Sequence, residues 1–118
     1  MSKVLVVDDE EDIGIMMKAM LKSSRYTVVY ASNIDDATNE LKKEVFETVF
    51  LDLNLDNEYG LKLVTTIRKT NRDANIIVIT AQKKSEVKQE VTSHGINSLI
   101  QKPFNKSQIL TALETRGE

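Results

Sequence analysis

The alternation of apolar and polar positions divides the chain into short segments of two kinds. The first kind is rich in β-branched and other apolar residues, as expected of strands. These runs are "KVLVV" (3–7), "YTVVYA" (26–31), "FETVFL" (46–51), "NIIVIT" (75–80) and "NSLI" (97–100). Most of them are continuously apolar rather than alternating, which is typical of strands covered on both faces, as in a parallel sheet.

Apolar residues at helical spacing fill the intervals between these runs. The stripes are Ile13, Met16, Met17, Met20 and Leu21; Ile34, Ala37, Leu41 and Val45; Leu61, Val64 and Ile67; Val87 and Val91; and Ile109, Leu110 and Leu113. Asn33 is placed as the N-cap of the second stripe, and Asn105 with Gln108 as a capping box for the last. Gly14 stands inside the first stripe although glycine in a helix costs about 1 kcal/mol relative to alanine. The sequence offers no reason for it.

The strand-then-helix order repeats along the whole chain. It predicts an α/β fold in which helices cover both faces of a parallel sheet and the connections are right-handed. A length of 118 residues suits one domain with a proper core. Because no repeat, low-complexity segment or linker interrupts the pattern, we expect a single domain over residues 1–118.

Composition and charge narrow the class of protein further. Lys+Arg 16 against Asp+Glu 18 gives a net charge of −2, which argues against a chain that mainly neutralises nucleic-acid phosphates. Without cysteine there is no disulfide, thiolate metal site or cysteine nucleophile. No apolar run approaches the length of a membrane span, and the start "MSKVLVV" lacks the layout of a signal peptide. We expect a cytoplasmic domain without membrane contact.

Polar residues that could do chemistry follow the ends of the predicted strands. Asp8 and Asp9 follow the first strand, Asp52 the third, Thr80 the fourth and Lys102 the fifth. Because the carboxyl ends of parallel strands meet at one edge of a sheet, we expect these side chains to gather there. Carboxylates held close together raise each other's pKa values unless a cation joins them. Oxygen ligands of this kind suit Mg²⁺.

Together these residues point to phosphoryl transfer onto an aspartate. A carboxylate can act as a covalent nucleophile towards phosphorus, and Mg²⁺ and Lys102 would stabilise the charge of the incoming group. Thr80 could donate a hydroxyl hydrogen bond to it. Each residue alone has a plain structural reading: an acidic pair that starts a helix, an Asx turn at Asp52, a strand-end threonine, and a turn at Lys102-Pro103. Because all of these residues stand at the ends of predicted parallel strands, a common phosphoryl-transfer site is favoured over these separate structural roles.

The chain resembles, over its whole length, the receiver domain of two-component response regulators of the chemotaxis-regulator kind. The matching pieces are "VLVVDDE", "VFLDLNL" followed by Gly60, "IIVITA" and "GINSLIQKPF". The resemblance implies a doubly wound, flavodoxin-like (βα)5 fold with strand order 2-1-3-4-5. It implies a phosphorylation-dependent switch that accepts a phosphoryl group from a sensor histidine kinase or histidine phosphotransfer protein and signals to an output partner or domain. Such a domain catalyses only its own phosphorylation and dephosphorylation, and is a monomer or a weak phosphorylation-dependent dimer.

The resemblance also assigns roles to residues of this chain. Asp52 is the phosphoacceptor. Mg²⁺ is bound directly by Asp9, through water by Asp8, by Asp52, and by the backbone carbonyl of Asn54. Thr80 is the hydroxyl switch.

The remaining implied role belongs to Lys102, the partner of the phosphoryl group, with a cis peptide bond before Pro103. Two departures from the family pattern affect how a signal would leave the domain. The family often has Met-Pro where this chain has Leu55-Asp56, so we expect a less rigid, more acidic loop. It usually has Tyr or Phe three residues before its lysine, where this chain has Leu99.

Two other functions fit part of the pattern. A phosphatase of the haloacid dehalogenase type also uses an aspartate nucleophile, Mg²⁺ and a lysine, but places the nucleophile after the first strand in an Asp-x-Asp pattern that "VVDDE" lacks. A flavin-binding module of the same topology needs a Ser-, Thr- and Gly-rich phosphate loop there. The acidic "DDEED" would repel the FMN phosphate.

Overall fold

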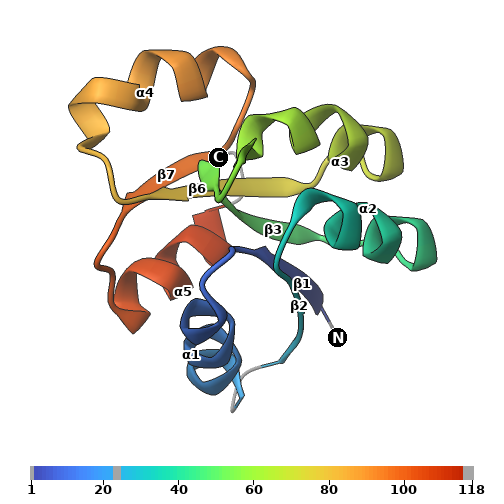
Figure 1. Cartoon of the computed structure of the whole chain (residues 1–118). Coiled ribbons are helices and arrows are strands. Elements are labelled where there is room, and N and C mark those ends of the chain that lie inside the picture. Colours follow the sequence, from blue (N-terminus) through green and yellow to red (C-terminus); the bar gives the residue numbers. More distant parts are fainter. Residues whose placement is uncertain (1, 23–24, 116–118) are drawn as a thin grey trace.

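The structure, a computed structural model that describes residues 2–22 and 25–115, contains a five-stranded parallel sheet (Figure 1). The strands are β1 (Ser2–Val7), β2 (Tyr26–Ala31), β3 (Thr48–Asp52), β6 (Asn75–Thr80) and β7 (Ser98–Gln101). Their order across the sheet is β2-β1-β3-β6-β7. Two short strands, β4 (Asn54–Leu55) and β5 (Glu58–Tyr59), form a separate hairpin. Counted without this hairpin, the order is 2-1-3-4-5, so the predicted doubly wound fold is confirmed.

Helices cover both faces of the sheet (Figure 1). They are α1 (Glu11–Leu21), α2 (Ile34–Lys43), α3 (Val64–Thr70), α4 (Lys84–Ser93) and α5 (Lys106–Thr115), with a 3-10 turn η1 (Gly60–Leu63) before α3. The helices α1 and α5 share one apolar cluster with the sheet, and α2, α3 and α4 share the other. No helix among the described residues is long and apolar enough to cross a bilayer.

The continuous apolar runs arise because both faces of each central strand are buried. Successive side chains of a strand point to opposite faces. In β1, Val4 and Val6 enter the cluster beneath α1 and α5, whereas Leu5 and Val7 enter the cluster beneath α2, α3 and α4. All four are fully buried. The sheet is therefore the middle layer of a three-layer domain, which leaves its strand ends as the place for polar side chains.

The helix ends follow the predicted capping signals, with one correction. Asn33 Oδ1 accepts the Asp36 N–H at 2.7 Å. Asn105 and Gln108 form the reciprocal capping box, at 2.8 and 2.9 Å. The second stripe was wrong in including Val45, because α2 ends at Lys43 and Val45 is 57% exposed. The chain becomes extended at the helix end and buries the next residue, Phe46, instead.

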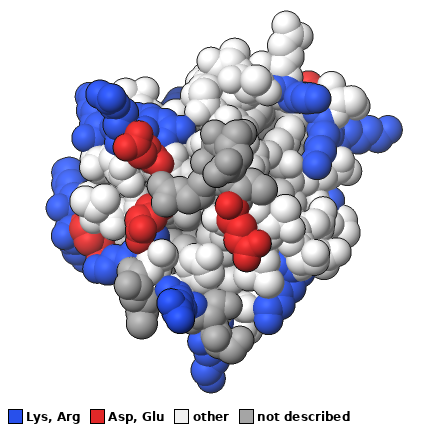
Figure 2. All heavy atoms as spheres, turned by 180° about the vertical axis from the view of Figure 1, so that it is seen from behind, with Lys and Arg blue, Asp and Glu red and all other residues white. Residues whose placement is uncertain are grey.

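The surface turned away from Figure 1 carries charges of both signs. Lys and Arg side chains lie in several groups around the rim, interrupted by Asp, Glu and uncharged residues (Figure 2). This differs from the continuous basic stripe that is typical of a surface for nucleic-acid backbone.

Arg68 joins two connections at the end of the molecule opposite the carboxyl edge of the sheet. Its guanidinium donates to the carbonyl oxygens of Arg72 at 3.2 Å, Ala74 at 2.5 Å and Gly95 at 2.9 Å, and to Asn97 Oδ1 at 3.2 Å. It thereby fastens the turn between α3 and β6 to the turn between α4 and β7. A planar group with five donors suits this geometry, and an ammonium does not.

We expect Arg68→Ala to lower the free energy of unfolding by about 2 kcal/mol, because several carbonyls lose a charged donor. Arg68→Lys should recover only part of this. Urea denaturation followed by circular dichroism measures the change, with the exposed neighbour Lys69→Ala as the control. If Arg68→Ala and Lys69→Ala unfold at the same urea concentration, Arg68 does not fasten these turns.

Candidate functional site

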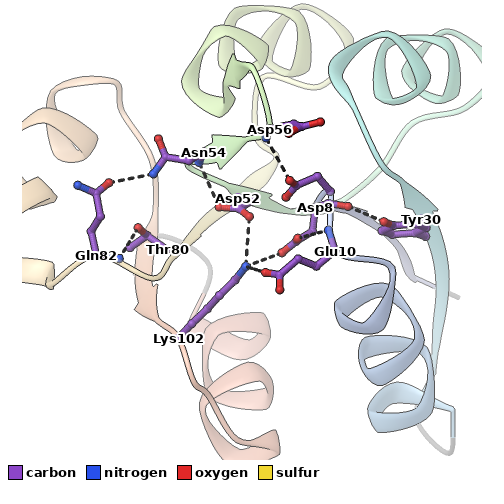
Figure 3. A network of polar contacts seen from close by, with 10 residues as sticks. Asp8, Glu10, Tyr30, Asp52, Asn54, Asp56, Thr80, Gln82 and Lys102 are labelled. Atoms are coloured by element: carbon purple, nitrogen blue, oxygen red, sulfur yellow. Dashed lines mark hydrogen bonds and ion pairs between the residues drawn. The ribbon is translucent and has the colours of Figure 1, made fainter.

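The predicted site residues lie at the carboxyl edge of the sheet (Figure 3). Asp52 and Thr80 are the last residues of β3 and β6, Asp8 directly follows β1, and Lys102 directly follows β7. The strands stop here for local reasons. Pro103 has no N–H with which to continue β7, and its peptide bond is cis, as the resemblance implied. The parallel register then brings strand ends that are far apart in sequence to one place.

The ammonium of Lys102 stands at the centre of the acidic residues. Its Nζ is 2.9 Å from Asp8 Oδ2, 3.0 Å from Glu10 Oε1 and 3.1 Å from Asp52 Oδ2. The side chains of Asp8 and Asp52 are only 0% and 7% exposed, while that of Glu10 is 64% exposed. A single cation is thus shared by three carboxylates, two of which are buried.

The charges in this cluster shift one another's protonation. Burial, and then the charge of Asp8, raises the pKa of Asp52 to about 6, against the lowering effects of Lys102 and the Asn54 N–H. Burial also raises the pKa of Asp8, although hydrogen bonds from the Glu10 N–H and Lys102 oppose it. Burial lowers the pKa of Lys102, but its carboxylate partners outweigh this and raise it above the ordinary lysine value. The lysine therefore stays charged, and the negative charge in the cluster exceeds its own.

The geometry of the acidic oxygens fits a divalent cation. Asp8, Glu10 and Asp52 each offer an oxygen, and these oxygens lie within 4.8 Å of one another. Asp8 Oδ2 is buried and lies 2.9 Å from Lys102 Nζ. Hard oxygen donors with excess negative charge are what Mg²⁺ binds.

Two predicted metal ligands lie beside this group of oxygens. The exposed Asp9 accepts the Asp56 N–H through Oδ2 at 3.1 Å. The Asn54 N–H donates to Asp52 Oδ1 at 3.1 Å. Metal binding by Asp9 and by the Asn54 carbonyl therefore stays a prediction. Glu10 was not predicted as a site residue. It is the third acid of "DDE", but it stands further from the end of the strand than the predicted Asp8 and Asp9.

Thr80 is at the same edge, but its hydroxyl is directed at the following loop. The residue is fully buried, and its Oγ1 accepts the Gln82 N–H at 3.0 Å. The Gln82 side chain in turn accepts a hydrogen bond from Asn54 Nδ2 at 2.9 Å. Gln82 thus connects the loop after β6 both to Thr80 and to the segment that follows Asp52 (Figure 3).

The segment after Asp52, where we expected a less rigid, more acidic loop, contains a short hairpin. The strands β4 and β5 pair across a turn in which Asp56 has a φ of 45°, and Leu55 is buried. Gly60 then passes so close that a Cβ there would be 1.9 Å from the Asp52 carbonyl oxygen. Any side chain at this position would push the backbone of Asp52 out of place.

Comparison with known proteins assigns the family. A family model described as the response regulator receiver domain matches residues 4–114. The chain belongs to this family. Receiver domains are phosphorylation-dependent signalling switches rather than typical enzymes, which decides against the phosphatase and flavin-binding alternatives.

Individual receiver proteins are similar over most of the chain. The transcriptional regulatory protein DltR of Streptococcus agalactiae is 28% identical over 97% of this chain and 51% of its own length. A Burkholderia pseudomallei response regulator, solved with a phosphorylated aspartic acid and a calcium ion, is 31% identical with a TM-score of 0.90, over 99% of this chain and 69% of that one. TrrA of Thermotoga maritima, solved with Mg²⁺ and BeF, is 29% identical with a TM-score of 0.83, over 97% of both chains. The chain spans about half the length of the curated relatives.

We expect Asp52→Asn to stabilise the metal-free protein at neutral pH. Because Asp52 has a pKa of about 6 when folded and 3.8 as the ordinary value, the folded state holds the proton longer. Wild-type stability should therefore fall as the pH rises from 4 to 6, and the asparagine variant should lack the part of this loss that Asp52 causes. At pH 7.5 in EDTA the variant should be more stable by about 1–3 kcal/mol.

Urea denaturation at a series of pH values measures this difference. Asp35→Asn, at an exposed carboxylate on α2, is the control and should change stability by less than about 0.5 kcal/mol. Equal stability of wild type and Asp52→Asn at pH 7.5 would show that the surroundings do not destabilise the charged form of Asp52.

Proposed function

We propose that residues 1–118 form the receiver domain of a response regulator, in which Asp52 accepts a phosphoryl group from the phosphohistidine of a sensor kinase or phosphotransfer protein. The observation that carries the assignment is the buried Asp52 carboxylate, 3.1 Å from Lys102 and grouped with the oxygens of Asp8 and Glu10. The phosphorylated aspartic acid of the Burkholderia relative and the Mg²⁺–BeF complex of the Thermotoga relative support it.

The proposed reaction is a single displacement at phosphorus. A carboxylate oxygen of Asp52 forms a bond to the phosphorus while the bond from phosphorus to the donor nitrogen breaks, and the imidazole leaves with that electron pair. Lys102 exchanges its contact with Asp52 for one with a phosphoryl oxygen, so its charge meets the new anion. The domain would promote this reaction and the later hydrolysis, and no reaction of another substrate.

Mg²⁺ is the cofactor that we propose for this step. Asp9 would bind it directly and Asp8 through water, with Asp52 and the Asn54 carbonyl as the other protein ligands. When bound, Mg²⁺ neutralises the carboxylates and the transferred oxygens. Asp9 accepts the Asp56 N–H and is not among the three acids whose oxygens lie within 4.8 Å of one another, so its side chain would have to turn towards them. Glu10 is the competing candidate for the direct ligand, because its oxygen already lies in the group.

We expect phosphorylation by acetyl phosphate to need both Asp52 and Mg²⁺. Intact-mass measurement should show one added phosphoryl group on wild type, none on Asp52→Asn, and none in EDTA. Undiminished phosphorylation of Asp52→Asn would refute the acceptor. Mg²⁺ titration followed by amide NMR shifts separates the two ligand candidates: Asp9→Ala should abolish Mg²⁺ binding, whereas Glu10→Gln should retain it. The opposite result would assign the direct ligand to Glu10.

We also propose that the signal leaves through the loop after β6 and helix α4. The Thr80 hydroxyl accepts the Gln82 N–H, so its movement towards a phosphoryl group on Asp52 would disturb the start of this loop. The helix beyond it is weakly held, because only Val87 and Val91 are buried. Leu99 has no ring to rotate and packs, half-buried, against the same apolar cluster.

We expect beryllofluoride with Mg²⁺ to change amide hydrogen exchange across residues 81–94 and to leave Leu99 nearly unchanged. Thr80→Ala should still bind beryllofluoride but lose most of the change in residues 81–94. Mass-spectrometric hydrogen exchange with and without beryllofluoride measures the change in wild type and in Thr80→Ala. A large change at Leu99 beside an unchanged α4 would place the output on β7 instead.

The partners follow from the family only in outline. A histidine kinase or phosphotransfer protein as donor and an output domain or partner as receiver are part of the proposal. So are a cytoplasmic location, the monomeric or weakly dimeric state, and the lack of direct contact with nucleic acid or membrane.

A further inference from the structure

Tyr30 reaches from β2 to the backbone at the start of the site. Its hydroxyl donates to the carbonyl oxygen of Asp8 at 2.5 Å. The Asp8 N–H donates to the carbonyl oxygen of Ala31 at 3.1 Å. Both main-chain groups of Asp8 are therefore held by consecutive residues of one neighbouring strand, and Figure 3 shows the bond from Tyr30.

The ring of Tyr30 occupies the space that Gly14 leaves on α1. A Cβ at Gly14 would lie 2.5 to 2.8 Å from three ring carbons of Tyr30. Contacts that short do not occur, so Gly14 and Tyr30 fit only as a pair. This accounts for a glycine inside a helix, which the sequence left unexplained.

Packing alone does not account for the hydroxyl of Tyr30. A phenylalanine would fill the same slot and would bury no polar atom. Burial, and then the charge of Asp8, raises the pKa of the phenol, which therefore stays protonated and remains a donor. The carbonyl that accepts its hydrogen bond belongs to the peptide unit joining Asp8 to Asp9. Fixing this unit fixes the directions in which both side chains leave the backbone.

We propose that Tyr30 is a positioning residue for the Mg²⁺ site: its hydroxyl holds the Asp8–Asp9 peptide unit so that both carboxylates are ready for the cation. The inference rests on the proposed function, since it concerns that site. Partners that orient the ligands of a metal without touching it commonly affect its affinity strongly.

The test compares Tyr30→Phe with Tyr26→Phe, the same chemical change at the other end of β2. Mg²⁺ titration followed by amide NMR shifts gives the dissociation constant. We expect about a 5-fold weaker affinity for Tyr30→Phe, the equivalent of one hydrogen bond, and no change for Tyr26→Phe. In metal-free protein the Asp8 carbonyl carbon should move upfield in Tyr30→Phe alone. At saturating Mg²⁺ the phosphorylation rate with acetyl phosphate should return to nearly that of wild type.

Wild-type Mg²⁺ affinity in Tyr30→Phe would overturn the inference and leave the proposed function intact. A wild type that binds no Mg²⁺ would instead overturn the proposed function.

Gly14→Ala provides a second, independent route to the same hydroxyl. Its added methyl group must displace the Tyr30 ring, so it should also weaken Mg²⁺ binding. Combined with Tyr30→Phe, it should weaken binding no further, because the hydrogen bond is already lost. If the two effects multiply, Gly14 acts through the helix and the hydroxyl is not the route.

Discussion

The constraint on which the site depends is the sharing of one ammonium by three carboxylates at the end of a buried sheet. Asp8 and Asp52 are almost completely removed from water, and each lies about as close to Lys102 as a hydrogen bond allows. Buried charges of one sign are costly unless a partner compensates them. With a single lysine against three acids, the compensation is incomplete, so the metal-free site is poised to take up a cation. The affinity for Mg²⁺ that we propose results from this repulsion among the carboxylates.

Hydrogen bonds from main-chain N–H groups hold this repulsive arrangement in place. The Glu10 N–H holds Asp8 Oδ1 at 2.8 Å, and the Asn54 N–H holds Asp52 Oδ1. The Gly60 N–H donates to the Leu53 carbonyl at 2.7 Å and brings the chain back against Asp52. These bonds leave the outer carboxylate oxygens free to face the lysine. The main chain supplies the positions, and the side chains supply the charge.

The sequence predicts those parts of this arrangement that follow from strand ends. Asp8, Asp52, Thr80 and Lys102 each stand at or just after the end of a strand, and parallel strands bring such positions together whatever the details of packing. Glu10 lies further along, in a turn whose direction is set by its own hydrogen bond to Asp8. The fit of Gly14 against Tyr30 depends on how a helix lies across a strand, which residue spacing does not encode. The hairpin after Asp52 was missed because its strands have only two residues each.

The energies at Gln82 explain why this connection suits a switch. Two neutral hydrogen bonds hold it to the site, one to Thr80 and one from Asn54. Each contributes about 1 kcal/mol. The hydrogen bond that we propose from Thr80 to a phosphoryl oxygen would be charge-assisted and roughly twice as strong. Exchanging the first kind for the second therefore yields a modest gain, within the 1–3 kcal/mol or so that couples sites in allosteric proteins. A phosphoryl group can shift the equilibrium between two conformations of the domain only by this difference, so the hydrogen bond that it replaces must be weak. The neutral bond between the Gln82 N–H and Thr80 meets this condition.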